Sequence, residues 1–194
     1  MKMLRNAAFG FGLVLAAASA QAQTWTLESS ASKLAFGSIK FNDLGEVHSF
    51  KSIDGAVAED GTVTLGIDLS SVETNIDIRN ERMMEFVFKN APRATVTAQI
   101  DMGALETLGV GDSTVIEADG VVSLIGNEVD LFGDLFVLRL ATDKVLVTTD
   151  SMIFLTTADA GIDGGVDKLK ELADLPIISR AVPVTMRLIF DADS

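Results

Sequence analysis

The sequence predicts an all-β fold of about eight antiparallel strands with one or two short helices, arranged as a closed barrel or a sandwich. Three observations lead to this fold class. Apolar and polar residues alternate along most of the chain after residue 23, a pattern typical of strands with one buried face. Turn-forming segments such as Glu59-Asp60-Gly61 separate the alternating stretches at short intervals. Only two segments have the composition or spacing of a helix, and many short strands with few helices favour a barrel or a sandwich.

The first 22 residues have the pattern of a secretory signal peptide. Lys2 and Arg5 precede an uncharged apolar run at 7–18, and Ala20-Gln21-Ala22 supplies the small residues that a signal peptidase recognises. An apolar run of about 12 residues is too short to span a bilayer as an anchor. We therefore expect cleavage near Ala22, a single domain at 23–194, and a periplasmic location.

The strands are predicted from period-2 alternation. Val63, Leu65 and Ile67 alternate with Thr62, Thr64 and Gly66. The last alternating stretch, 182–191, lies near the C-terminus. The strand candidates, in chain order, are 33–41, 47–58, 62–69, 95–102, 114–124, 128–140, 145–155 and 182–191.

Two segments are predicted to be helical. Residues 77–86 are rich in straight-chain side chains, and residues 166–175 place Val166, Leu169 and Leu172 on one face. Gly164-Gly165 precedes the second segment and Pro176 follows it, which fits both boundaries.

The composition excludes several classes of function. The chain has 194 residues, 48% of them hydrophobic, with no Cys, one His and a formal net charge of −13. Removal of the leader leaves 13 Lys and Arg against 28 Asp and Glu. Nucleic-acid binding needs clustered cations, which this chain lacks. The absence of Cys excludes thiolate nucleophiles, disulfides and Cys-bearing zinc sites, so no metal and no cofactor are expected.

A search for catalytic or metal-binding residues gives no constellation. His48 with Ser49 has neither a nucleophile elbow nor an acid partner in sequence, so His48 is interpreted as a surface or loop residue. Asp159, Asp163 and Asp167 recur every four residues, which does not fit a calcium loop and favours the start of the second helix. An enzyme is not predicted.

The barrel is predicted to be soluble with an apolar interior. An outer-membrane barrel would carry aromatic girdles at both interfaces. The chain has no Tyr and one Trp, and it ends in Asp-Ala-Asp-Ser, so an integral membrane protein is not expected.

The segment 66–96 contains an ordered set of residues that match a known signature. They are Ile67, Asp68, Ser71, Val72, Thr74, Arg79, Phe86, Phe88, Pro92, Ala94 and Thr95. The signature is a strand of the type I-D-x-x-S-I-x-T, then an R-D-x-x-L helix, a Phe-containing turn and P-x-A-T-F, and in it the segment resembles the YceI-like family. Trp25, Gly55, 120–126 and 159–190 resemble further family features in the same order, so the resemblance covers the whole chain after the leader.

The chain departs from the family pattern at three places. Ala31-Ser32 stands where the family has His-Ser, Asn80-Glu81-Arg82 replaces an Asp-x-His, and Val96 replaces the last Phe. They bear on contacts made by the family's His residues rather than on the fold.

The resemblance implies an eight-stranded antiparallel, lipocalin-like barrel, periplasmic and often dimeric, that holds an isoprenoid lipid or quinone for carriage or storage. An eight-stranded barrel is wide enough either to pack solid or to hold one ligand. Small residues, Gly66, Ala98, Gly120, Gly126 and Gly133, are expected to leave room inside.

The candidate ligand-binding residues are the apolar barrel lining and the residues at its mouth. They are Leu65, Ile67, Met83, Phe86, Phe88, Val96, Ile100, Leu124, Met186, Leu188 and Phe190, with Met84 as a further mouth residue. Arg79 either contacts a ligand head group or pairs with a neighbouring carboxylate, and the second role is favoured.

A second hypothesis is an interaction module without a ligand. In this alternative a solid barrel forms a homodimer through the strand at 131–140, whose apolar residues on both faces predict burial on both sides. Extraction of a prenyl lipid from the purified protein would distinguish the two hypotheses.

Overall fold

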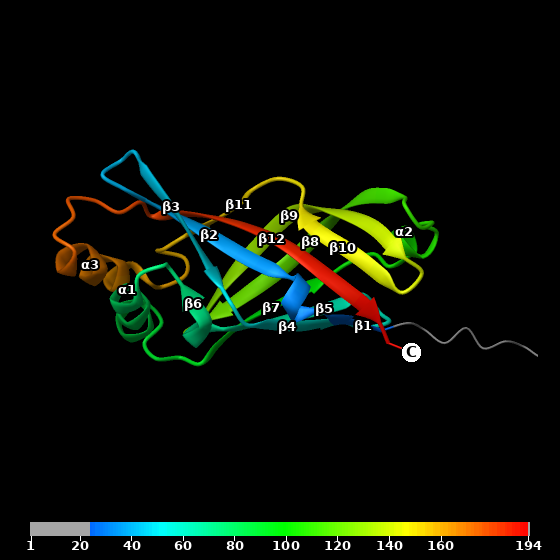
Figure 1. Cartoon of the computed structure of the whole chain (residues 1–194), viewed down its shortest axis with the longest axis horizontal. Helices are drawn as coiled ribbons and strands as arrows, with labels where there is room; N and C mark the ends of the chain where they lie inside the picture. The colour runs from blue at the N-terminus through cyan, green and yellow to red at the C-terminus, as the bar shows by residue number, and fades with distance from the viewer. Residues whose placement is uncertain (1–23, 194) are drawn as a thin grey trace, which may run out of the picture.

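The computed structural model describes residues 24–193 and consists mainly of strands (Figure 1). The strands are β1 (Trp25–Leu27), β2 (Lys33–Lys40), β3 (Leu44–Phe50), β4 (Ile53–Val57), β5 (Thr62–Asp68), β6 (Val72–Glu73), β7 (Arg93–Gln99), β8 (Ser113–Leu124), β9 (Asn127–Ala141), β10 (Lys144–Thr149), β11 (Ile153–Thr156) and β12 (Ala181–Ala192). The helices are η1 (Ser29–Ala31), η2 (Leu69–Ser71), α1 (Asp77–Arg82), η3 (Met83–Val87), α2 (Gly103–Glu106) and α3 (Asp163–Leu172). The predicted signal peptide lies outside the described residues.

Eight strands close into a ring. The order is β1-β4-β5-β7-β8-β9-β10-β12, and β12 pairs with β1 to complete it. Every neighbouring pair is antiparallel, with Trp25 opposite both Val57 of β4 and Ala192 of β12. The fold class predicted from the sequence, an eight-stranded antiparallel barrel with few short helices, is therefore confirmed.

The remaining strands extend four members of the ring after local breaks. η1 separates β1 from β2, residues 51–52 separate β3 from β4, η2 separates β5 from β6, and residues 150–152 separate β10 from β11. Beyond these breaks β2 pairs with β12 and β3, β3 pairs with β6, and β11 pairs with β12. These four additional strands lengthen the barrel beyond the eight-strand ring.

The predicted strands correspond to the observed ones closely where they are long. The predicted segments 114–124, 128–140 and 182–191 agree with β8, β9 and β12 to within one residue at each end. The predicted 47–58 and 145–155 are each interrupted, and the short strands β1 and β6 were not predicted.

Helices lie at both ends of the barrel, with α1, η3 and α3 at one end and α2 at the other (Figure 1). The predicted helix 77–86 is α1 followed by one π-helical segment, η3. The predicted helix 166–175 begins three residues earlier, at Asp163, and ends at Leu172. Asp163 is the first residue of α3, and its carboxylate accepts hydrogen bonds from the Thr157 hydroxyl and the Arg180 guanidinium.

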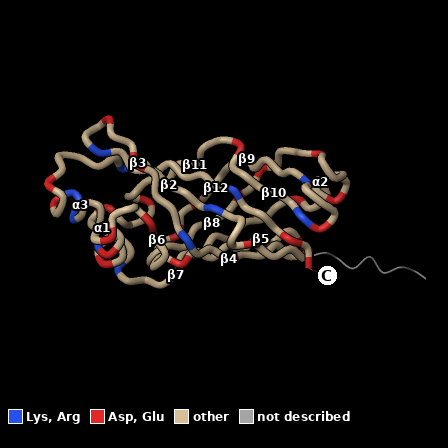
Figure 2. Tube along the Cα trace, viewed as in Figure 1, with Lys and Arg blue, Asp and Glu red and all other residues tan. Residues whose placement is uncertain are grey.

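The core follows the alternation along the strands. In β12 Leu188 and Phe190 point inward and are buried, while Arg187, the residue before Leu188, is exposed. Lys144 joins strands on the outside through ion pairs with Glu28 and Asp191. Cationic and acidic residues alternate over the helices at one end of the barrel (Figure 2). Within residues 24–193 no helix is long and apolar enough to cross a membrane.

Candidate functional site

The interior of the barrel holds a cavity of about 950 Å³. Its lining extends from Leu105 and Leu108, around α2, to Ile76 and Leu175, beside α1 and α3 at the opposite end. The inward residues of the long strands supply most of its wall, because alternate side chains of a strand point to the same face. The cavity therefore follows directly from the period-2 pattern in the sequence.

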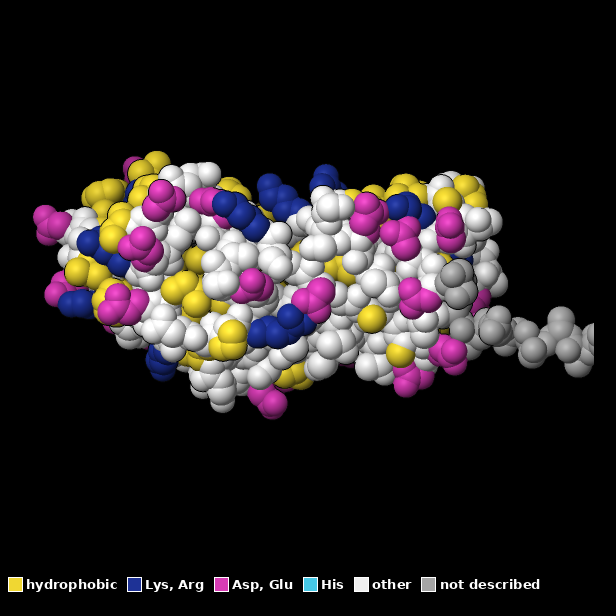
Figure 3. Space-filling model, turned by 60° about the horizontal axis from the view of Figure 1, so that its bottom comes forward, with side chains coloured by type: hydrophobic (Ala, Val, Ile, Leu, Met, Phe, Trp, Pro, Cys, Tyr) yellow, Lys and Arg dark blue, Asp and Glu magenta, His cyan; other side chains and the backbone are white. Residues whose placement is uncertain are grey.

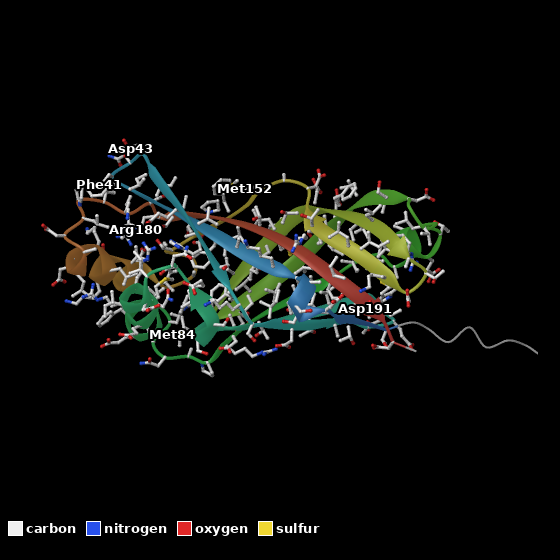
Figure 4. The ribbon with its side chains drawn as sticks, in the orientation of Figure 1. Phe41, Asp43, Met84, Met152, Arg180 and Asp191 are labelled. Atoms are coloured by element: carbon white, nitrogen blue, oxygen red, sulfur yellow. The ribbon has the colours of Figure 1, made fainter. Side chains whose placement is uncertain are left out.

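Most of the predicted ligand-binding residues line this cavity. Those that do are Leu65, Ile67, Met83, Phe88, Val96, Ile100, Leu124, Met186, Leu188, Phe190 and Arg79. Phe86 and Met84 do not, and Figure 4 shows Met84 beside β6 near α1. In the π-helical segment η3, Met83 and Val87 are buried and line the cavity, as does Phe88 directly after it. Of the four predicted mouth residues, Met83 and Phe88 therefore line the cavity, whereas Met84 and Phe86 do not.

Small residues widen one side of the cavity. Ala98 of β7 lies opposite Gly120 of β8, and Ala118 of β8 lies opposite Gly133 of β9, with all four lining the cavity. Two glycines expected here lie elsewhere. A Cβ on Gly66 would overlap the Arg93 guanidinium, and Gly126, with φ of 86°, forms the turn between β8 and β9.

Aromatic rings line the half of the cavity nearer α1. Phe36 stacks on Phe50 with ring centroids 5.3 Å apart, and Phe50 lies 6.0 Å from Phe88. Phe36 and Phe50 occupy inward positions of the neighbouring strands β2 and β3, and η3 places Phe88 beside them. Such offset pairs form a wide apolar surface on which an unsaturated chain can pack.

A polar cluster lies at the α1 end of the mainly apolar lining. It consists of Ser38 and Lys40 of β2, Glu46 and His48 of β3, and Arg79 of α1. Ser38 and Glu46 face each other across β2 and β3. Lys40 Nζ lies 3.1 Å from Glu46 Oε1, and Ser38 Oγ lies 3.1 Å from His48 Nε2.

The structure corrects the interpretation of His48 as a surface or loop residue. His48 is only 5% exposed, at an inward position of β3. Burial lowers the pKa of its imidazole below the ordinary value, and the nearby positive charge of Arg79 lowers it further. Its Nδ1 atom is buried without a hydrogen-bond partner in the described residues. The alternation of β3 could have indicated this position, because Glu46, His48 and Phe50 share one face.

Arg79 holds α1 against the barrel. Its Nη1 donates to Glu46 Oε2 at 2.8 Å and its Nη2 donates to the Thr74 carbonyl at 2.6 Å. Burial raises the pKa of Glu46, but Lys40 and Arg79 outweigh this effect and lower it overall. The carboxylate partner favoured by the sequence is thus present. The Nε atom of Arg79 is buried and has no partner in residues 24–193.

This cluster has part of a nucleophilic site. Ser38 and His48 are within hydrogen-bond distance, which the sequence did not reveal because they are ten residues apart on two strands. A working triad also needs an acid to orient the imidazole through its second nitrogen. In the part of the chain that the structure describes, Nδ1 meets no acid, and no group of three or more His, Asp or Glu residues could hold a metal ion.

Comparison with known proteins identifies structural relatives. No family model matches this chain, and no curated protein matches it either. A solved structure described as a polyisoprenoid binding domain from Saccharophagus degradans, implicated in plant cell wall breakdown, superposes with a TM-score of 0.85. It is 34% identical, and the alignment covers 87% of this chain and 98% of that one. The chain belongs to the YceI-like family.

Two more distant structures have the same fold. Burkholderia cenocepacia BcnA matches with a TM-score of 0.62 at 14% identity, over 84% of this chain and 98% of BcnA. A mutant CJ YceI protein made for nanotechnology applications matches with a TM-score of 0.55 at 12% identity, over 76% of this chain and 84% of its own. The YceI-like chain described here therefore shares its barrel with structures of low sequence identity.

Proposed function

We propose that this YceI-like protein is a secreted periplasmic binding protein that holds an isoprenoid lipid, a polyisoprenoid or an isoprenoid quinone, inside its barrel for carriage or storage. The observation that carries the proposal is the cavity of about 950 Å³ with an almost wholly apolar wall. This volume is at the upper end of the range of roughly 300–1,000 Å³ found for small-molecule sites.

The wall selects for a hydrocarbon chain. Leu65, Val96, Ile100 and Leu188 offer only methyl and methylene groups, so a ligand at this level gains nothing from hydrogen-bonding groups of its own. Burial of an apolar chain contributes about 0.8 kcal/mol per CH2. A prenyl tail therefore gains affinity along its whole length, and its methyl branches fit beside the small residue Ala118.

The polar cluster suits the head group of such a lipid. His48 Nδ1 and Arg79 Nε are buried groups without partners, and an unmet buried polar group costs free energy until a partner arrives. Arg79 Nε–H is a donor, and so is His48 Nδ1–H when the Ser38 hydroxyl donates to Nε2. A head group that carries an acceptor oxygen, such as a quinone carbonyl or a phosphate, meets this requirement. Arg79 would then combine its structural role with a head-group contact.

The location in this proposal rests on the sequence, because the predicted leader at 1–22 supports secretion to the periplasm. Binding without chemistry is supported by the polar cluster, in which His48 Nδ1 has no acid partner among the described residues.

The proposal is tested by extraction of the protein purified from periplasm. Organic solvent followed by mass spectrometry is expected to yield one prenyl lipid per barrel. A barrel that is empty after native purification, and that does not take up a prenylated quinone added in detergent, would overturn the proposal. Arg79→Ala and His48→Ala should weaken binding of a quinone more than binding of a prenyl hydrocarbon without a head group.

The second candidate, a dimerising module, retains one supporting observation. That hypothesis assumes a solid barrel, whereas the interior holds a cavity. The outer face of β9 nevertheless exposes Phe132 and Leu140, so the expected burial on both sides of this strand is not achieved within one chain. A second copy on this face would supply it, and a mass measurement by light scattering tests this.

A further inference from the structure

We propose that the end of the barrel beside α1 and α3 docks on the surface of a zwitterionic lipid bilayer. The docking surface, here called the rim, consists of Phe41, Leu44, Ile76, Ile78, Leu172 and Ile177, all of them exposed. Figure 3 shows hydrophobic side chains gathered at this end of the molecule. The purpose of docking rests on the proposed function, whereas docking itself can be measured without a ligand.

The rim is held in place by the fold. The Phe41 amide donates to the Ile177 carbonyl at 3.4 Å, and the Ser179 amide donates to the Ile39 carbonyl at 2.7 Å. These bonds join the tip of the β2–β3 hairpin to the segment between α3 and β12. Phe41 lies at that tip, at the outer edge of the molecule in Figure 4. The ion pair of Arg79 with Glu46 fixes α1 on the other side of the opening.

The rim continues into the cavity. Ile76 and Ile78 are 45% and 51% exposed, yet both also line the cavity, as do Leu175 and Ile178 beside them. An apolar surface therefore connects the interior of the barrel with the outside at this end. If this surface is seated on a bilayer, a lipid tail can pass between the membrane and the cavity without entering water. Exposure of the tail to water would cost about 0.8 kcal/mol for each CH2 group.

The charges around the rim favour a neutral bilayer. Arg180 pairs with Asp163 and Asp167, and Lys168 pairs with Glu171 at 3.0 Å, so several carboxylates near α3 are already neutralised. Asp43 at the hairpin tip makes no ion pair with the described residues, and Figure 4 shows it beside Phe41. The net charge of −13 for the whole chain opposes binding to anionic lipids.

A bilayer fits this surface better than a second copy of the chain does. A partner chain seated on the rim would close the route that Ile76 and Ile78 open into the cavity. Interfacial docking instead needs only a set of apolar side chains that enter the boundary between head groups and acyl chains, about 5–10 Å deep.

The test is flotation of the purified protein with phosphatidylcholine vesicles. Phe41→Ser with Leu44→Ser is expected to lower vesicle partitioning about tenfold, since two half-exposed side chains lose their burial in the bilayer. The matched control is Met152→Ser with Phe154→Ser, which removes two side chains that are 53% and 63% exposed but lie away from the rim; Figure 4 shows Met152 apart from Phe41. This control should bind vesicles as the unchanged protein does.

The outcomes separate docking from ligand binding. Equal loss in both double variants, loss only in the control, or no flotation of the unchanged protein would overturn the proposal. A rim variant that loses flotation together with a halved mass in light scattering would assign the rim to a dimer and overturn it as well. Lipid content, measured by mass spectrometry, should stay unchanged in the rim variant, whereas an empty barrel with intact flotation would count against the proposed function alone.

Discussion

Replacement of Ala118 by Phe tests whether the barrel cavity holds the lipid. Ala118 and Gly133 face each other across β8 and β9, and both line the cavity. A Cβ on Gly133 would lie 3.3 Å from the Ile153 side chain, so the free space at this level adjoins Ala118 rather than Gly133. A phenyl ring at Ala118 therefore enters the space that the tail would occupy.

The size of the effect follows from the carbon atoms displaced. Phe has six more side-chain carbons than Ala, so the tail gives up about six carbons of burial at about 0.8 kcal/mol each. The expected loss is about 5 kcal/mol, or roughly 10³–10⁴-fold in Kd. A tail too short to reach Ala118 should lose little, which makes the loss depend on tail length.

The assay is native mass spectrometry with prenylated quinones of graded tail length. Glu117→Phe is the matched control, because Glu117 is the next residue of β8 and points outward, where it is exposed. Circular dichroism of both variants checks that the barrel remains folded. If Ala118→Phe binds long-tailed quinones as tightly as Glu117→Phe does, the tail is not in the barrel and the reasoning is refuted.

Three further predictions concern stability and assembly. Because the pKa of His48 is lowered in the folded state, the stability that this residue contributes is present above pH 6.5 and declines as the pH falls below that value. In His48→Gln, the free energy of unfolding measured in urea should therefore depend less on pH between about pH 7.5 and about pH 5. A Cβ on Gly165 would lie 2.6 Å from Val87 Cα, so Gly165→Ala should destabilise by about 1–3 kcal/mol, whereas Gly164→Ala, with open space around it, should stabilise by about 0.5–1 kcal/mol in thermal unfolding. If the β9 face forms a dimer, Phe132→Asp should halve the mass in light scattering, and an unchanged mass would remove the dimer hypothesis.

The sequence predicted the wall of the barrel better than its ends. Long strands such as β8 and β12 have enough alternating residues to define both the strand and its inner face. β1 has three residues and β6 has two, too few for any periodicity, so their places in the sheet depend on partners far away in the chain. The π-helical turn of η3 is likewise too short to leave a period in the sequence. Phe86 therefore lies away from the cavity, whereas Val87 and Phe88 line it.

The apolar part of the site was predictable and the polar part was not. Inward positions such as Leu65, Val96 and Met186 follow from alternation alone. The polar cluster joins Ser38, His48 and Arg79 from two strands and a helix, and only the pairing of β2 with β3 brings the first two together. Composition made His48 look incidental, because a lone imidazole in an acidic chain is usually solvated. Its burial depends on the whole barrel.

The pairing of β1 with β12 sets the order in which this protein can assemble. Thr24 and Asp193 are 169 positions apart, yet their side chains form a hydrogen bond of 2.7 Å where the ring closes. Closing so long a loop is slow, since the entropy cost comes before the contacts that repay it. Short connections join the pairs β2–β3, β4–β5, β7–β8, β8–β9 and β9–β10, so these pairs can form locally first, as parts of an open curved sheet with its apolar face uncovered. We therefore expect the cavity to be completed last, when β1 pairs with β12. An apolar molecule that already lies on the open sheet would be enclosed at that step.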